Sequence, residues 1–414
     1  MTNPLALVLE PNAWALLEAV TPLGIAGARD ALGDLDADTR AAIVTQVELR
    51  AAAQDKFGEF ARSLLLTRDG LEQATRLAVG ALHARRFRDG GCTVVADLGC
   101  GIGADALAIA GLGLGVRAWD IDESAVSATT VNLRFFPNCT VTHGDVTALS
   151  MRDLANAGVD GVFADPARRT GSSRGNQRIH APEHWSPPLS AILAWREHGA
   201  PADRLGVKVA PGIDYRVIPA DMHAQWVSID KSVVEASLWT PAMSNGPGRS
   251  AVVFRGSENL EIEAAGDPSA PAPSIDVATL GSYLWEVDGA VVRAGLLREF
   301  AESAGALGII SPSIAFLTSE ERVTDEWKLA VSEFEILAVT SLKPKAIAGA
   351  LASFTPTDIE VKKRGADISP ETLRRTILKA CGIKRPSGEN VRTIFATRVG
   401  GQHRAIIAHR LNLP

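Results

Sequence analysis

The chain has 414 residues, more than one ordinary hydrophobic core needs, which predicts two to four domains. Apolar residues make up 46% and charged residues 22%, as in soluble globular proteins, and no apolar stretch approaches the roughly 18 residues of a membrane span. The four cysteines lack zinc-ligand spacing, the histidines are scattered and the N-terminal stretch lacks a basic region, so we expect a cytoplasmic protein without a metal site or a secretory signal.

The net charge of −6 hides a strong asymmetry along the chain. Residues 341–414 hold fourteen Lys and Arg against five Asp and Glu, a net charge of +9, so the other residues carry −15. A basic end on an acidic chain indicates a docking surface for a polyanion. A basic surface without any partner stays open as an alternative.

Residues 1–88 are predicted to be helical, because Ala, Leu, Asp and Arg dominate and no strand-like alternation is present. The run Thr67–Gly70 interrupts the pattern, which resumes at helical spacing from Leu71 to Phe87. No residues typical of chemistry stand out, and we interpret this N-terminal helical segment as a cap or a substrate lid.

Residues 89–256 alternate short β-branched strands with helices, which predicts a parallel α/β sheet. The expected strands are Thr93–Asp97, Val116–Asp120, Thr140–His143, Asp160–Ala164, Leu205–Ala210, Trp226–Ile229, Val233–Leu238 and Ser250–Arg255. The last two of these strands follow each other without a full helix between them, so we expect a final antiparallel hairpin at the sheet edge.

A linker is expected at residues 264–274, where small residues and three prolines show no periodicity. An α+β pattern resumes at 276–340 and continues through 341–414, where Gly400-Gly401 joins two strands as a hairpin. The sequence gives no signal for oligomeric state.

The most informative run is Val95 to Asp105, in which Gly99, Gly101 and Gly103 follow an apolar strand and precede a helix. Glycines allow backbone to approach a ligand closely, and a helix N-terminus offers free N–H groups. On their own, these glycines fit both a dinucleotide site and an S-adenosylmethionine (SAM) site.

Three acids at successive strand ends favour SAM over a nicotinamide or flavin cofactor. Asp97 lies two residues before the first glycine, where its carboxylate can hold the methionine ammonium, a group that nicotinamide cofactors lack. Asp120 ends the second strand and is placed to accept hydrogen bonds from ribose hydroxyls, and Asp145 follows the third strand, within reach of the adenine amino group. For Asp145, helix capping is the competing explanation.

The runs Asp97-Leu98-Gly99-Cys100-Gly101-Ile102-Gly103 and Asp120-Ile121-Asp122 resemble motifs of the class I SAM-dependent methyltransferases, a likeness that covers roughly residues 90–256. Residues 360–374 resemble the THUMP-like domain of one branch of these enzymes, and residues 283–318 resemble its ferredoxin-like insert. The resemblance implies a Rossmann-like sheet, SAM as cofactor and a C-terminal module oriented towards RNA.

The fourth strand ends in Asp165-Pro166-Ala167-Arg168, which resembles the (Asp/Asn)-Pro-Pro-aromatic motif of amino-group methyltransferases. In that motif the carboxylate or amide oxygen and a proline carbonyl accept hydrogen bonds from the acceptor amine, so we assign the catalytic role to Asp165 and Pro166. Ala167 and Arg168 depart from the motif. We expect Arg168 and Arg169 to contact substrate, and Trp185 to stack on a base unless it is ordinary loop packing.

The basic module adds Lys362, Lys363 and Arg364 as candidate substrate contacts, and its scarcity of aromatic residues favours folded RNA over single strands. The sequence thus predicts a methyltransferase acting on a base in structured RNA, rRNA or tRNA. Two alternatives stay open: a methyltransferase acting on protein or a small molecule, and a non-catalytic RNA-binding protein with a relic SAM fold.

Overall fold

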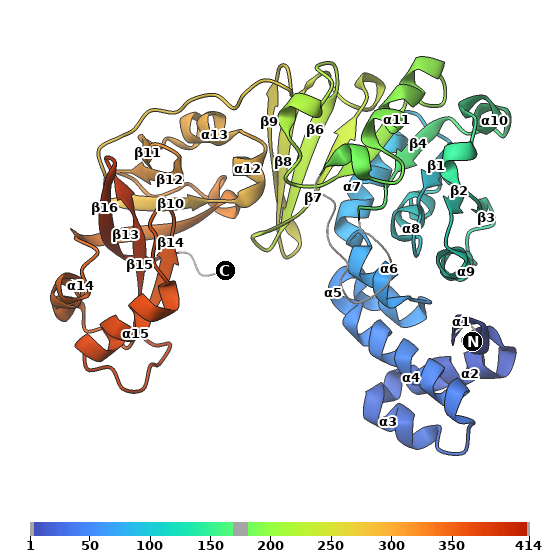
Figure 1. The fold of residues 1–414 in the computed structure, drawn as a ribbon, viewed down its shortest axis with the longest axis horizontal. Helices are drawn as coiled ribbons and strands as arrows, with labels where there is room; N and C mark the ends of the chain where they lie inside the picture. Colours follow the sequence, from blue (N-terminus) through green and yellow to red (C-terminus); the bar gives the residue numbers. More distant parts are fainter. Residues whose placement is uncertain (1–3, 169–180, 412–414) are drawn as a thin grey trace. The chain divides into compact units, whose positions relative to one another are not determined.

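The computed structural model describes residues 4–168 and 181–411, which form two compact units (Figure 1). The first unit runs to Ile213 and includes Asp221–His223 and Ser237–Pro247. The second unit comprises Asp214–Ala220, Ala224–Ala236 and the described residues from Gly248 onward.

Helices precede the first strand, as the sequence predicts for residues 1–88. They are α1 Pro4–Leu9, α2 Pro11–Val20, α3 Gly24–Ala31, α4 Ala37–Ala52, α5 Gln54–Phe57, α6 Arg68–Gln73 and α7 Leu77–Asp89. Asp36 begins α4 as an N-cap, because its carboxylate accepts a hydrogen bond from Thr39 N at 2.9 Å.

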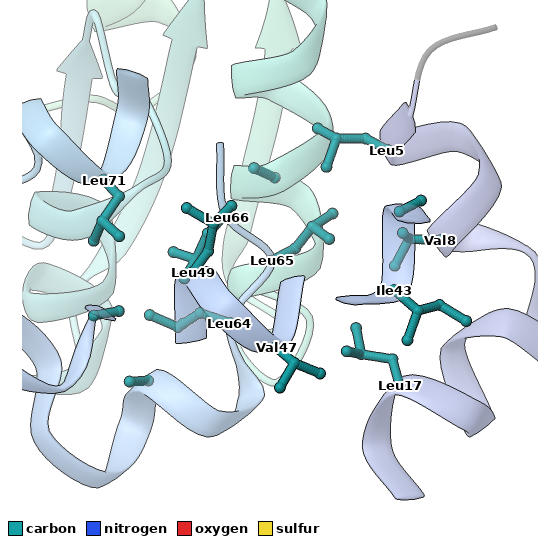
Figure 2. Packing of buried hydrophobic residues seen from close by; sticks show 14 of the residues in the cluster. Leu5, Val8, Leu17, Ile43, Val47, Leu49, Leu64, Leu65, Leu66 and Leu71 are labelled. Atoms are coloured by element: carbon teal, nitrogen blue, oxygen red, sulfur yellow. The ribbon is translucent and has the colours of Figure 1, made fainter. Parts of the chain in front are cut away.

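The apolar faces of these helices share one core with the neighbouring part of the first unit (Figure 2). Leu17 and Ile43 are fully buried, as are Leu65 and Leu66 in the segment after α5. Burying one such side chain contributes about 1.5–3 kcal/mol. The same cluster includes Ile102 of the glycine run, so the N-terminal helices pack directly against the predicted cofactor loop.

The strands and helices that follow alternate along the chain. They are β1 Val94–Leu98, α8 Ala104–Gly111, β2 Gly115–Asp120, α9 Glu123–Asn132, β3 Cys139–His143, α10 Met151–Asn156, β4 Gly161–Ala164, α11 Leu189–Ala194, β5 Leu205–Val209, β6 His223–Ile229, β7 Ser232–Trp239, β8 Gly248–Arg255 and β9 Glu258–Ala265.

Nine strands of the described chain form one sheet in the order β3-β2-β1-β4-β5-β7-β6-β8-β9. Strands β1 to β5 pair in parallel, β1 with both β2 and β4, β2 with β3, and β4 with β5. The α/β fold class expected from the sequence is confirmed. Because parallel strands end at the same edge, the carboxyl ends of β1, β2 and β4 lie together, where open α/β sheets bind ligands.

The hairpin at the sheet edge consists of β8 and β9 and not of the last two expected strands, β7 and β8, because β6 lies between those two in the sheet order. β9 pairs antiparallel with β8 and ends at Ala265, inside the expected linker of residues 264–274. The rest of that linker is anchored: the buried guanidinium of Arg249 donates to Pro268 O at 2.7 and 3.1 Å.

The remaining elements belong to the second unit. They are β10 Tyr283–Val287, α12 Gly289–Arg293, α13 Leu297–Ala304, β11 Gly308–Ser311, β12 Ile314–Ser319, β13 Val331–Thr340, α14 Pro344–Leu351, β14 Asp358–Lys363, α15 Pro370–Ala380, β15 Val391–Val399 and β16 Gln402–Arg410.

Seven of these described strands form a second sheet in the order β11-β12-β10-β13-β16-β15-β14. Its neighbouring strands are antiparallel except β14 and β15, which run parallel. Because β13 pairs with β16, residues from both 276–340 and 341–414 contribute to one sheet. Ile347, Ile359 and Ile377 are buried in the core cluster that joins α14 and α15 to this sheet.

Candidate active site

The glycine run between β1 and α8 forms a tight turn that needs glycine at three positions. Gly99, Gly101 and Gly103 have φ values of +88°, +56° and +79°, a region that other residues rarely adopt. A Cβ on Gly99 would lie 2.7 Å from the backbone oxygen of Asp165, whereas a Cβ on Gly101 would meet no atom within 4 Å. The loop therefore approaches the end of β4 at Gly99 and borders open space at Gly101.

Asp120 holds this loop in place from the end of β2. Its Oδ2 atom accepts a hydrogen bond from Gly101 N at 2.8 Å, and its Oδ1 atom accepts one from Asp122 N at 2.9 Å. The carboxylate is half-buried, and each of its oxygens has a further lone pair. Asp120 can thus brace the loop and still accept a hydrogen bond from a ligand hydroxyl.

The carboxyl group of Asp97 is buried at the end of β1, with the residue 1% exposed. Its Oδ2 atom has no hydrogen-bond partner among the described residues. Burial raises the pKa of Asp97 well above its ordinary value, and the nearby charges of Asp105, Asp165 and Asp120 raise it further. A buried carboxyl group with one oxygen atom that lacks a partner among the described residues, close to three other acids, fits a cationic ligand group, which is what the ammonium and sulfonium of SAM supply.

Asp145 is exposed and caps the short helix at Val146–Ala148. Its Oδ1 atom accepts hydrogen bonds from Thr147 N at 2.8 Å and from Thr147 Oγ1 at 2.7 Å. These hydrogen bonds from Thr147 lower the pKa of Asp145. The capping explanation therefore accounts for this residue without a ligand.

Asp165 and Pro166 follow β4 directly. Asp165 N donates to Leu98 O at 3.0 Å, which ties the segment to the end of β1, and Pro166 is buried. Ala167 and Ser186 form an antiparallel bridge with N···O distances of 2.9 and 3.1 Å. The backbone is therefore held on both sides of Pro166, at Asp165 by the hydrogen bond to Leu98 and at Ala167 by the bridge to Ser186.

The expected aromatic platform is covered rather than open. Trp185 is only 2% exposed, and the guanidinium carbon of Arg168 lies 5.9 Å from the centre of its ring. Arg168 is half-buried, and its charge acts on Asp165. Arg169 lies outside the described residues.

A chain of buried polar groups behind Asp165 was not foreseen from the sequence. Lys208, on β5, donates to Asp165 Oδ2 at 2.9 Å and to Thr75 Oγ1 at 2.8 Å. Thr75 Oγ1 lies 2.6 Å from Asp105 Oδ2, and His83 Nδ1 lies 2.8 Å from Asp105 Oδ1. A lysine on a buried strand needs a carboxylate or ligand partner, and the carboxylate of Asp165 supplies one here.

The pKa values of the two acids in this chain, Asp105 and Asp165, are shifted in opposite directions. Burial would raise the pKa of Asp105, but the hydrogen bonds and charges of His83, Lys208 and Thr75 lower it below its ordinary value. Burial raises the pKa of Asp165, and the charges of Lys208 and Arg168 counteract part of that rise. Perturbed acids of this kind cluster at functional sites.

The candidate substrate residues on β14 and after it contact their own unit. Lys362 pairs with Glu286, and Lys363 Nζ donates to Ile368 O at 3.0 Å. Arg364 donates to Ala315 O at 2.9 Å. These contacts give all three cations a role in holding the second unit together, whether or not they also contact a substrate.

No group of three or more His, Cys, Asp or Glu that could hold a metal ion occurs among residues 4–168 and 181–411. Within the same residues, no helix is both long and apolar enough to cross a membrane. All four cysteines are free thiols.

Comparisons with known proteins agree with this fold. The family described as THUMP domain-like matches residues 331–410. Two Mycobacterium tuberculosis proteins, from strains CDC 1551 / Oshkosh and H37Rv, are both named uncharacterized S-adenosylmethionine-dependent methyltransferases. Each is 28% identical over 368 residues, covering 86% of this chain and 92% of its own length. A crystal structure of a protein from Porphyromonas gingivalis W83, classed as a methyltransferase, has a TM-score of 0.74 at 18% identity and covers 96% of this chain and 98% of that one.

The structural likeness shows the fold, and the relatives and the matched family agree with the resemblance seen in the sequence. The chain is therefore a SAM-dependent methyltransferase of class I fold that carries a THUMP-like domain.

Proposed function

We propose that this enzyme methylates a base in structured RNA. The observation that carries the proposal is the position of Asp165-Pro166 at the carboxyl end of β4, where the backbone of Asp165 lies against Gly99 of the glycine loop. Donor and acceptor would then meet at one edge of the sheet, as alignment for direct methyl transfer requires.

The cofactor would be held by Asp97, Gly99, Gly101, Gly103 and Asp120. Asp97 would receive the ammonium group of SAM, because its Oδ2 atom is buried without a partner among the described residues. Asp120 would accept from the ribose. The role of Asp145 in adenine binding stays a prediction, since its carboxylate already caps a helix. Bound SAM supplies the activated methyl group.

The acceptor would be oriented by the Asp165 carboxylate and the Pro166 carbonyl. The Asp165 side chain is 24% exposed although Lys208 occupies one of its oxygens. The other oxygen can therefore accept a hydrogen bond from an acceptor N–H. Arg168, half-buried beside it, would add positive charge where an RNA phosphate or base edge approaches.

RNA contact would come from the helices of the THUMP-like region more than from β14. Five cations of α14, α15 and the following loop are exposed and form no ion pair with another described residue, whereas Lys362 pairs with Glu286. The five are Lys345, Arg375, Lys379, Lys384 and Arg385. Solvated cations of one sign on adjoining elements are suited to neutralising a phosphate backbone.

The proposal is tested with labelled SAM and three fractions from a strain lacking the gene: total RNA, total protein and small molecules. We expect label in one RNA size class. Label confined to protein or to small molecules would contradict the RNA assignment, and SAM binding without label in any fraction would favour the non-catalytic alternative.

A double variant, Arg375→Gln with Lys379→Gln, tests the route of RNA binding. These residues lie one turn apart on α15, and removing each cation that neutralises a phosphate should lower the slope of log affinity against log salt by about 0.7–0.9. We expect weaker RNA binding and a shallower slope. The matched control is Arg62→Gln with Arg85→Gln, two exposed arginines of the first unit, which should change neither.

A cytoplasmic location remains a prediction that accompanies this proposal.

A further inference from the structure

The ammonium of Lys208 lies at the centre of the buried polar chain behind Asp165. Lys208 is 4% exposed and reaches Asp165 Oδ2 at 2.9 Å, Thr75 Oγ1 at 2.8 Å and Gln73 O at 3.5 Å. Thr75 follows α6, so the N-terminal helical segment contributes directly to the site. Asp105, at the start of α8, and His83, on α7, complete the chain.

Donor and acceptor roles in this chain follow from chemistry alone. An ammonium group can only donate, so the Thr75 hydroxyl accepts from Lys208 and donates its own proton to Asp105 Oδ2. The second oxygen of Asp105 faces His83 Nδ1, which donates when Asp105 is ionised. His83 is fully buried, and its ring centre lies 4.8 Å from that of Phe163. The far end of the chain is therefore held rigidly in the core.

We propose that Lys208 is a positioning residue for methyl transfer: anchored through Thr75 and Asp105, it fixes the Oδ2 atom of Asp165 and leaves Oδ1 to the acceptor. This inference rests on the proposed function, because it assigns the geometry of the same acceptor site. It also gives α6 and α7 a part in catalysis that the sequence interpretation as a cap or lid did not include.

We call the hold of Lys208 on the Asp165 carboxylate, anchored through Thr75 and Asp105, the clamp. The charges around Asp165 explain why it is needed. Asp105 and Asp97 act on it from α8 and β1, Arg168 from its own loop and Lys208 from β5, while Asp120 acts on the neighbouring Asp97. Without Lys208, burial and the surrounding acids would favour the protonated form of Asp165. A protonated carboxyl group already carries a proton, so it could not accept the N–H proton of the acceptor as the ionised group can.

The reaction that this arrangement serves is the transfer of a methyl group from sulfur to an acceptor nitrogen. The lone pair of an acceptor nitrogen forms the new bond to the methyl carbon, and the electron pair of the broken carbon–sulfur bond stays on sulfur. The nitrogen then loses one N–H proton, which the Oδ1 atom of Asp165 accepts. Lys208 stays protonated throughout, and its positive charge stabilises the Asp165 carboxylate until the carboxylate accepts this proton.

The experiment compares Thr75→Val, Thr75→Ser and Lys208→Met with the wild type, using the acceptor fraction that the wild type labels. Thr75→Val keeps the shape but removes the hydroxyl that holds Lys208 and Asp105 together. We expect kcat to fall about 100-fold in Lys208→Met, the lower end of the range typical of general acid–base effects, and about tenfold in Thr75→Val, which keeps the ammonium group. The KM for SAM should change less than about threefold, since neither residue is assigned to the cofactor, and Thr75→Ser should restore kcat.

The pH profile separates positioning from plain destabilisation. Lys208→Met removes the charge that lowers the pKa of Asp165, and Thr75→Val removes the hydroxyl that holds this charge beside it, so the acid limb of the kcat profile should move to higher pH in both variants, and further in Lys208→Met. A merely unstable enzyme would lose activity at every pH without this shift. An unchanged kcat and acid limb in Thr75→Val would overturn the proposal.

A measurement without turnover keeps the clamp testable if the RNA assignment fails or Lys208→Met does not fold. Carbon NMR of aspartate carboxyls, with Asp165→Asn to assign the signal, reports the titration of Asp165 directly. We expect a higher midpoint in Thr75→Val than in the wild type, and equal midpoints would reject the clamp. Absence of label in RNA together with a raised midpoint would reject the proposed function and leave the clamp standing.

Discussion

Replacing Asp97 by asparagine tests the proposed cofactor site most sharply. The change preserves the shape of a side chain that is 1% exposed, so it removes a charge without opening a cavity. In the ligand-free enzyme it also removes the mutual repulsion of Asp97 with Asp105, Asp165 and Asp120. The variant therefore separates ligand binding from folding, because the two should move in opposite directions.

The expected loss of affinity follows from the burial of the group. A hydrogen bond to a charged partner contributes about 1.5–3 kcal/mol, and about 1.4 kcal/mol corresponds to a tenfold change in Kd. The amide oxygen of asparagine retains part of the hydrogen bond. We expect Kd for SAM to rise by about 10- to 100-fold, a loss near the lower and middle part of that range.

Stability should respond to pH in a defined direction. The pKa of Asp97 is raised in the folded state, so the wild type loses stability as pH rises from the ordinary pKa of aspartate through the raised value. Asp97→Asn carries no such titration. Its advantage in Tm over the ligand-free wild type should therefore grow between pH 5 and pH 8.

Isothermal titration calorimetry with SAM and thermal melts at both pH values are the assays. A Kd within threefold of the wild type would show that Asp97 does not hold the ammonium group. A lower Tm at pH 8 than that of the wild type would show that its buried carboxyl group already has a stabilising partner, which would refute the electrostatic reasoning.

Three further substitutions test other parts of the structure. Gly99→Ala forces a φ of +88° on a residue with a Cβ and places that Cβ 2.7 Å from Asp165 O, so stability should fall by about 1–3 kcal/mol in urea unfolding; an unchanged midpoint would contradict the close approach. Arg50→Met removes buried hydrogen bonds to Leu64 O and the Thr21 hydroxyl, both at 2.9 Å, and should cost about 2–3 kcal/mol by the same method, whereas a loss below about 0.5 kcal/mol would mean that the apolar side chain replaces them fully. Trp185→Leu should lower Tm with little change in acceptor KM, because the ring is 2% exposed; a raised KM at constant Tm would restore its stacking role.

The ends of the strands and the conformation of the glycine loop were predictable because their sequence signals are local. Asp97 and Asp120 end apolar runs of strand length, and the glycines between them have a left-handed backbone that few other residues adopt. The alternation of strands with helices predicted a parallel sheet, and β1 to β5 do pair in parallel, but their order in the sheet was not predicted. β9 was missed although Leu260 and Ile262 alternate with glutamates, the period of a strand with one exposed face.

The buried polar chain was not predictable, because its members are distant along the sequence. Lys208 contacts Thr75 across 133 positions, and His83 contacts Asp105 across 22. A lysine on a buried strand signals only that some partner exists. Likewise, no local pattern shows that Trp185 is covered or that Lys362 pairs with Glu286, since burial and pairing of surface-type residues depend on tertiary structure.

Nucleoside analysis of labelled RNA decides whether Asp165 orients an RNA base for methylation. RNA from a strain lacking the gene is methylated with labelled SAM by the wild type and by Asp165→Ala, digested to nucleosides and separated. We predict label on one base with the wild type, reduced at least about 100-fold in the variant, in line with the loss of a general acid–base group. Label on ribose, or equal labelling by both enzymes, would contradict the proposed function.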